Sequence, residues 1–177
     1  INTRANSTLL GSKTLTEVCA MSLKDLAAWL PQVINTLNDD VKEIGSTILE
    51  EFMINAHALL SLGLGYLTLD RASSTLSTGE LQRVQLARTV KNRTTGVLYV
   101  LDEPSIGLHP ANVDGLIAIM KELIKDGNSI VLVDHDTRIL KEADYMIEIG
   151  PEAGKNGGSI ISQGTIDEII QDKNSII

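Results

Sequence analysis

Apolar residues recur every three to four positions between residues 22 and 62, and this spacing predicts two amphipathic helices. The first set is Leu23, Leu26, Ala27, Leu30, Ile34 and Leu37, and the second is Ile44, Ile48, Phe52, Ala56 and Leu59. Asn38, Asp39 and Asp40 mark the break between the two helices. We therefore expect residues 1–75 to form a mainly helical subdomain.

The pattern changes after residue 75, where short continuous apolar runs alternate with helical periodicity. The runs at 96–102 and 129–135 have the valine and leucine density of strands buried on both faces of a parallel sheet. Residues 110–127 between them predict a helix, with Pro110 in its first turn and Gly127 at its end. The order is that of a right-handed βαβ unit.

Two further strands and a final helix complete the predicted α/β part. The strands are expected at 145–150 and 159–164, with a glycine-rich turn at 154–158 between them, and the helix near Thr165. We therefore expect residues 76–177 to form a second part, with a mainly parallel sheet and flanking helices.

Composition and charge exclude several functions. The net charge of −8 repels phosphate backbones, and an aromatic content of 3% disfavours base stacking. A local basic cluster is an exception, and a solvated helix face is favoured there over a phosphate-contacting one. Its members are Arg83, Arg88, Lys91 and Arg93. Whether they contact DNA stays open from the sequence alone.

The remaining composition suggests a cytoplasmic protein without a membrane span. Cys19 is the single cysteine, so neither an internal disulfide nor a multi-cysteine zinc site is expected. No apolar run approaches the roughly 20 residues of a membrane helix. The chain starts at Ile1 rather than methionine, which suggests a piece of something longer.

Chemistry-bearing side chains follow two of the predicted strands. Asp102 and Glu103 end the first, and Asp134 and His135 end the second. Ligands of open parallel sheets sit beyond the carboxyl ends of the strands. One carboxylate of the first pair could hold Mg²⁺ while its neighbour polarises an attacking water, although an acidic loop after a buried strand is the simpler alternative.

The stretch from Ser77 to Glu80 has the pattern of a capping box and predicts a helix that begins there. Free backbone amides and the positive end of the helix dipole would then point outward. Gly79 would let this backbone approach a ligand closely, and a terminal phosphate fits such a place. A plain capped helix is the alternative.

The order of these motifs resembles that of ATP-binding-cassette ATPases. Their signature corresponds to "LSTGELQR" at 76–83, their Walker B end to Asp102 and Glu103, and their switch histidine to His135. Within that class, residues 60–168 resemble the first nucleotide-binding domain of the UvrA family, the damage-recognition subunits of bacterial excinucleases, or a close paralogue. The matching segments are "SLGLGYLTLDR", "TGVLYVLDEPSIGLHP", "DGNSIVLVDHD", "ADYMIEIGPEAGKNGG" and "QGT".

The resemblance implies roles for the matched residues. Asp102 would serve Mg²⁺, directly or through water, Glu103 would polarise the hydrolytic water, and His135 would sense the γ-phosphate. The signature residues would contact or support the γ-phosphate side of an ATP that another nucleotide-binding domain mainly holds. They are Ser77, Thr78, Gly79, Glu80 and Gln82.

Two departures from the family pattern suggest a paralogue as an alternative. Thr78 stands where a second glycine is common and could narrow the approach to phosphate, and Asp134 stands where glutamate is common. A transporter subunit is a further alternative, but membrane transporters usually carry an aspartate shortly after the Walker B turn, where this chain has Gly107, Leu108 and His109.

Several family features are missing from the sequence. "LLGSKT" at 9–14 imitates a P-loop, but Ser12 stands where a glycine is required. Zinc-binding cysteine clusters, a UvrB-binding insertion and a second nucleotide-binding domain are also missing. We therefore expect half a domain, inactive alone, whose full-length protein is a homodimeric DNA-repair ATPase with DNA and a UvrB-like partner.

Overall fold

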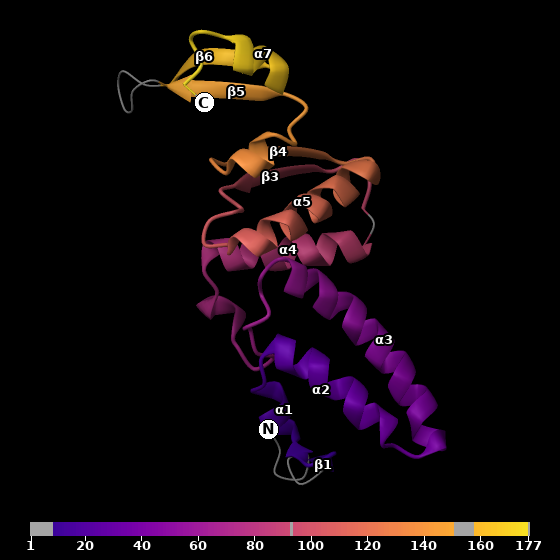
Figure 1. Cartoon of the computed structure of the whole chain (residues 1–177). Coiled ribbons are helices and arrows are strands. Elements are labelled where there is room, and N and C mark those ends of the chain that lie inside the picture. Colours follow the sequence, from indigo (N-terminus) through magenta and orange to yellow (C-terminus); the bar gives the residue numbers. More distant parts are fainter. Residues whose placement is uncertain (1–8, 93, 151–157, 177) are drawn as a thin grey trace. The chain divides into compact units, whose positions relative to one another are not determined.

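The computed structural model describes residues 9–92, 94–150 and 158–176 (Figure 1). The chain folds into two compact units, Ile1–Leu132 and Val133–Ile177. The predicted boundary after residue 75 stays a prediction.

A small hairpin opens the first unit. Strand β1 (Leu9–Leu10) pairs antiparallel with β2 (Lys13–Thr14). Thr14 then caps α1 (Leu15–Cys19) through reciprocal hydrogen bonds with Glu17. The stretch that imitates a P-loop therefore forms a hairpin turn, which the sequence pattern did not predict.

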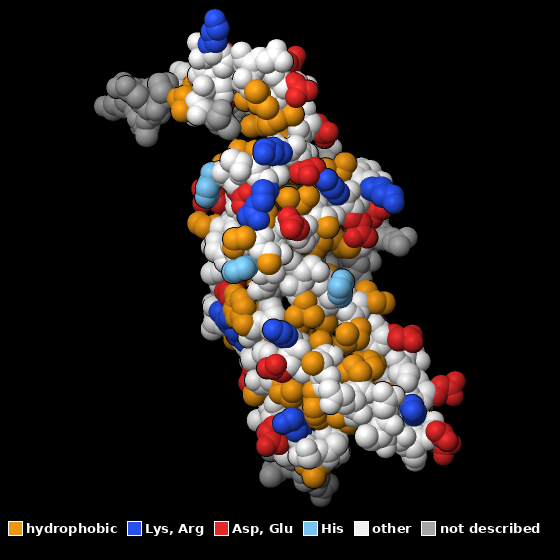
Figure 2. Space-filling view, viewed as in Figure 1, with side chains coloured by type: hydrophobic (Ala, Val, Ile, Leu, Met, Phe, Trp, Pro, Cys, Tyr) orange, Lys and Arg blue, Asp and Glu red, His pale blue; other side chains and the backbone are white. Residues whose placement is uncertain are grey.

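The two predicted amphipathic helices are present as α2 (Leu23–Asn35) and α3 (Asp39–Ser61). The predicted apolar face of α3 is wrong at its start, because Ile44 and Ile48 are each 65% exposed. There α3 instead places Gly45 against α2, since a Cβ atom at Gly45 would lie 3.0 Å from Ile34 Cδ1. Figure 2 accordingly shows hydrophobic side chains at the surface of the helix pair formed by α2 and α3.

The predicted βαβ unit is present and follows the helix that begins in the "LSTGELQR" stretch. After a short 3-10 turn, η2 (Ser73–Thr75), the chain forms α4 (Thr78–Asn92), β3 (Leu98–Asp102), α5 (Pro110–Lys125) and β4 (Ser129–Val133). Strands β3 and β4 are neighbours in one sheet. At their starts, Gly96 N bonds Gly127 O and Ser129 N bonds Val97 O, so the two segments advance in the same direction.

The prediction that these strands are buried on both faces is wrong for this chain. Leu98 and Val100 of β3 are 59% and 72% exposed, whereas Leu101 is buried. Val131 of β4 is also exposed. The reason is that the described residues of the first unit give this sheet two strands and cover only one of its faces.

The second unit contains α6 (Thr137–Leu140), β5 (Met146–Gly150), β6 (Ser159–Gly164) and α7 (Ile166–Gln171). Strands β5 and β6 pair antiparallel from Met146↔Gly164 to Gly150↔Ser159. Their connection is too short for a parallel crossover, so a hairpin results. The predicted turn at 154–158 lies outside the described residues except for Gly158. Helix α7 begins directly after Thr165, as expected, and Thr165 is its N-cap residue.

None of the described helices combines the length and the apolar character needed to cross a membrane.

Candidate functional site

The start of α4 has the predicted capping-box geometry. Ser77 N donates to Glu80 Oε2 at 2.7 Å, and Glu80 N donates to Ser77 Oγ at 3.2 Å. Gly79 lies in the first turn, where an added Cβ atom would be 3.4 Å from Arg83 Nη1 and 3.6 Å from Ile106 Cγ2. The glycine therefore keeps the space beside the helix start open.

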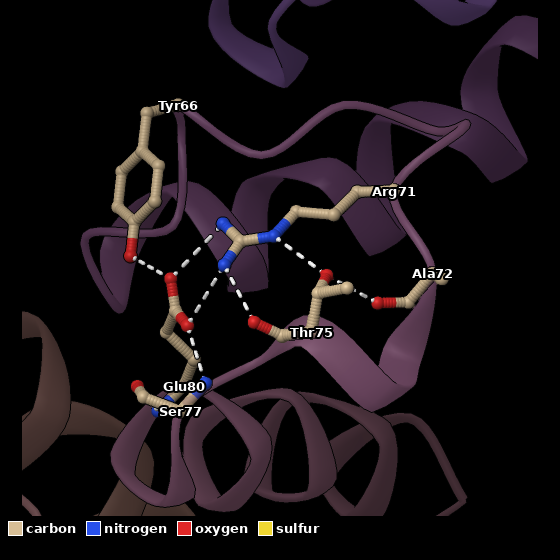
Figure 3. Close-up of polar contacts among 6 residues, drawn as sticks. All are labelled: Tyr66, Arg71, Ala72, Thr75, Ser77 and Glu80. Carbon is tan, nitrogen blue, oxygen red and sulfur yellow. Dashed lines mark hydrogen bonds and ion pairs between the residues drawn. The ribbon is translucent and has the colours of Figure 1, made fainter.

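The Glu80 carboxylate points inward, into a network that the sequence reasoning missed (Figure 3). Tyr66 Oη donates to Glu80 Oε1 at 2.5 Å, and Arg71 reaches both carboxylate oxygens at 3.2 Å. Arg71 also bonds Thr75 O at 3.0 Å. Glu80 is buried, so it supports the helix start from within the chain. Tyr66 and Arg71 lie in "SLGLGYLTLDR", which had suggested the family but no role for either residue.

This network controls the ionisation of Glu80. The hydrogen bond from Tyr66, followed by the bond from the Ser77 amide, lowers the pKa of Glu80 to about 2. Arg71 contributes in the same direction, whereas burial opposes the shift. Burial is also the main reason why the pKa of Tyr66 is raised. Glu80 is therefore a carboxylate at neutral pH.

Arg83 is buried, so the interpretation of the basic cluster as a solvated helix face is wrong for this residue. It is 5% exposed, and its Nη1 donates to Ile106 O at 3.1 Å and to Pro104 O at 3.5 Å. Arg88 on the same helix is exposed, as expected. The side chains of Lys91 and Arg93 lie outside the described residues. The helical spacing of Arg83 beside Leu86 and Ala87, both buried, could have indicated its inward face.

The turn after β3 carries the predicted carboxylate pair. Asp102 is exposed at the strand end, and Glu103 is half-buried with a φ of 46°. A positive φ is unfavourable for residues other than glycine and is often found at functional sites. Ile106 N closes the turn by donating to Glu103 O at 3.0 Å. Gly107 follows at a φ of 71°, where the missing Cβ atom matters.

A pocket of about 620 Å³ brings the signature stretch and this turn together. Its lining is Tyr66, Ser77, Thr78, Gly79, Glu80, Arg83, Ile106 and Gly107. Four of the five predicted signature residues line it, whereas Gln82 does not. The pocket combines the amino-terminal end of a 15-residue helix with a buried guanidinium, and both favour an anion.

The second chemistry-bearing strand end lies in the other unit. Asp134 Oδ1 accepts hydrogen bonds from the amides of His135 at 2.7 Å and Asp136 at 2.9 Å. Asp136 caps α6, and its hydrogen bonds with Arg138 lower its pKa. His135 is exposed. Because Asp102 and Glu103 belong to the first unit, the convergence of His135 with them stays a prediction.

Among the residues that the structure describes, no group of three His, Cys, Asp or Glu side chains could hold a metal ion. Asp102 alone can still fit Mg²⁺, because this ion usually keeps several waters and binds one or two carboxylates together with phosphate oxygens. The exposed carboxylate at the end of β3 meets that requirement.

Comparison with known proteins gives close relatives along the whole chain. It is 42% identical over 176 residues to UvrABC system protein A of Staphylococcus epidermidis, and 44% identical over 167 residues to the same-named protein of Bradyrhizobium diazoefficiens. These alignments cover 99% and 94% of the chain but only 18% and 17% of the relatives. No family model matches the chain.

The fold is similar to that of a solved structure. The crystal structure of UvrA2 from Deinococcus radiodurans superposes with a TM-score of 0.84 and 32% identity, over 99% of this chain and 23% of the other. The expected fold class, an ATP-binding-cassette half-domain preceded by helices, is thereby confirmed. Within that class the chain is a UvrA-type segment.

Proposed function

We propose that this chain is the signature and Walker B half of a UvrA-like ATPase, which couples ATP binding and hydrolysis to the recognition of damaged DNA in nucleotide excision repair. The observation that carries the proposal is the pocket at the start of α4, where the signature residues meet the turn that follows Glu103. Its anion-favouring chemistry suits the terminal phosphate of ATP. The relatives of the chain described above, each named UvrABC system protein A, support the repair role.

The signature residues would divide into those that contact the γ-phosphate and those that support the start of α4. Ser77, Thr78 and Gly79 line the pocket and would face the γ-phosphate, with Thr78 narrowing the approach. Glu80 would act from behind, because its carboxylate bonds Tyr66, Arg71 and Ser77. Gln82 does not line the pocket, so it would support the helix start as well.

The strand ends would supply the hydrolytic groups. Asp102 would hold Mg²⁺, which neutralises phosphate charge when it is bound. Glu103 would accept a proton from the attacking water, and His135 would contact the γ-phosphate. The left-handed backbone of Glu103 supports its assignment, because such strain is retained mainly where it orients a functional side chain.

The rest of the site would come from elsewhere in the full-length protein, which is five to six times longer in the relatives by the covered shares. Another nucleotide-binding domain would hold most of the ATP, and DNA and a UvrB-like partner would bind outside this segment. The 177-residue chain alone would then bind ATP weakly and hydrolyse it negligibly. The full-length protein would act in the cytoplasm as a homodimer.

A UvrA-like paralogue devoted to drug tolerance is a second candidate. Thr78 and Asp134, which depart from the common family residues, favour it. The two candidates differ in whether the full-length protein binds a UvrB-like partner, which a pull-down with purified UvrB would measure.

The proposal is tested by Glu103→Gln in the full-length protein. Removing the general base should lower kcat for ATP about a hundredfold or more, while ATP affinity stays within about threefold. Glu122→Gln on the exposed face of α5 makes the same chemical change away from the site and should leave both quantities unchanged. Wild-type turnover in Glu103→Gln would refute the assignment.

A further inference from the structure

Arg83 combines burial with an incomplete set of hydrogen bonds. Burying a guanidinium is costly unless its N–H groups are bonded. Nη1 of Arg83 bonds Pro104 O and Ile106 O, but Nε has no hydrogen-bond partner among the described residues. A leucine here would avoid that cost, so an arginine at this position indicates a role beyond packing.

Both acceptors belong to the turn that carries Glu103. Pro104 is the next residue, and Ile106 donates its own amide to Glu103 O at 3.0 Å. Glu103 itself stays at a φ of 46°, a conformation that a free turn would leave. The guanidinium therefore bonds the turn on the carboxyl side of Glu103 and restrains it in this strained conformation.

The same guanidinium also lies beneath the helix start. A Cβ atom added at Gly79 would be 3.4 Å from Arg83 Nη1, and both residues line the pocket. One side chain thus lies next to the part of α4 that faces the pocket and bonds the turn that carries Glu103.

We infer that Arg83 is a positioning residue for ATP hydrolysis, which holds the turn after β3 so that the Glu103 carboxylate points at the attacking water. This inference rests on the proposed function. It assigns Arg83 to catalysis through Glu103 and not to DNA binding, the role that its place in a basic cluster had left open.

The test uses the full-length protein without DNA and compares Arg83→Gln, Arg83→Lys and Glu103→Gln with the double variant Arg83→Gln/Glu103→Gln. Arg83→Gln should lower kcat about thirtyfold, because small misplacements of a catalytic group are expensive. ATP affinity should fall by a much smaller factor, because another domain would hold most of the ATP. In the Glu103→Gln background, the same substitution should change single-turnover rates by less than about twofold.

Arg83→Lys keeps the buried charge and addresses the case in which Arg83→Gln does not fold. Arg83→Lys should fold and lower kcat about threefold or more. In the Glu103→Gln background it should change the single-turnover rate by less than about twofold, as expected for Arg83→Gln. Arg88→Gln, an exposed arginine on the same helix, is the matched control and should retain wild-type kcat.

The outcomes separate this inference from the proposed function. The positioning role would be overturned by a wild-type kcat in Arg83→Lys, or by an Arg83 substitution that lowers the rate by the same factor in the wild-type and Glu103→Gln backgrounds. Neither result would change the role proposed for Glu103. Wild-type turnover in Glu103→Gln would instead refute the proposed function itself.

Discussion

At the scale of single residues, the charge on Glu80 stabilises the start of α4. Its pKa lies at about 2, mainly because the Tyr66 hydroxyl bonds the carboxylate. A depressed pKa stabilises the folded state fully above the ordinary value of 4.5, and the contribution is lost as the pH falls through about 2. The signature stretch is therefore held most firmly at neutral pH.

Tyr66→Phe tests this contribution. Loss of the tyrosine hydroxyl should raise the pKa of Glu80 and lower the free energy of unfolding by about 1 to 2 kcal/mol at pH 7. The difference from wild type should narrow between pH 4.5 and 2, as protonation removes the charged partner. Urea denaturation at several pH values measures it.

Tyr145→Phe is the control, because Tyr145 is an exposed tyrosine in the second unit. A loss in Tyr66→Phe that is independent of pH, or one that Tyr145→Phe matches, would contradict the role given to the Glu80 network.

The sequence identified the residues of the helix start but not the direction of their side chains. Ser77 and Glu80 formed the expected capping box, because that motif depends on local spacing. Tyr66 and Arg71 were missed because a preceding loop brings them to Glu80 through tertiary structure. The same reason explains why Arg83 was taken for a surface residue.

At the scale of elements, a close crossing of α3 and α5 supports the first unit. A Cβ atom added at Gly115 of α5 would lie 2.2 Å from the backbone oxygen of Ser61, which ends α3. Two helices can approach this closely only where one of them lacks a side chain. The position of α5, and with it the turn that precedes it, depends on this contact.

Gly115→Ala should therefore lower the free energy of unfolding by about 1 to 3 kcal/mol, although alanine is the better helix former. Thermal or urea denaturation measures the loss. Gly45→Ala is a graded control, because the nearest atom to its Cβ atom would be the flexible Cδ1 of Ile34 at 3.0 Å, with no backbone atom among its close contacts. Equal stability of the two variants would show that the crossing tolerates a methyl group.

Hydrophobic patterning predicted the positions of most elements but not all of their surroundings. The predicted runs at 96–102 and 129–135 form strands at Leu98–Asp102 and Ser129–Val133, because valine and leucine density suits a sheet. Their exposed faces could not be predicted, since composition does not reveal how many strands join. The hairpin of β1 and β2 was missed because two-residue strands carry no period.

At the scale of the whole molecule, the chain would supply one side of a nucleotide site under the proposed function. Its pocket presents backbone amides and a guanidinium, while the described residues contain no P-loop motif to grip the remaining phosphates. The chain spans about one fifth of the length of the relatives it matches. The proposed function therefore belongs to the full-length protein, in which a second nucleotide-binding domain completes the site.

A cryo-EM structure of the full-length Glu103→Gln variant with ATP and Mg²⁺ would show directly whether the α4 pocket receives the nucleotide. We predict that the terminal phosphate contacts Ser77 and Gly79 at the start of α4, while another domain holds the base and the other phosphates. ATP bound elsewhere, with the α4 pocket empty, would refute the proposed site.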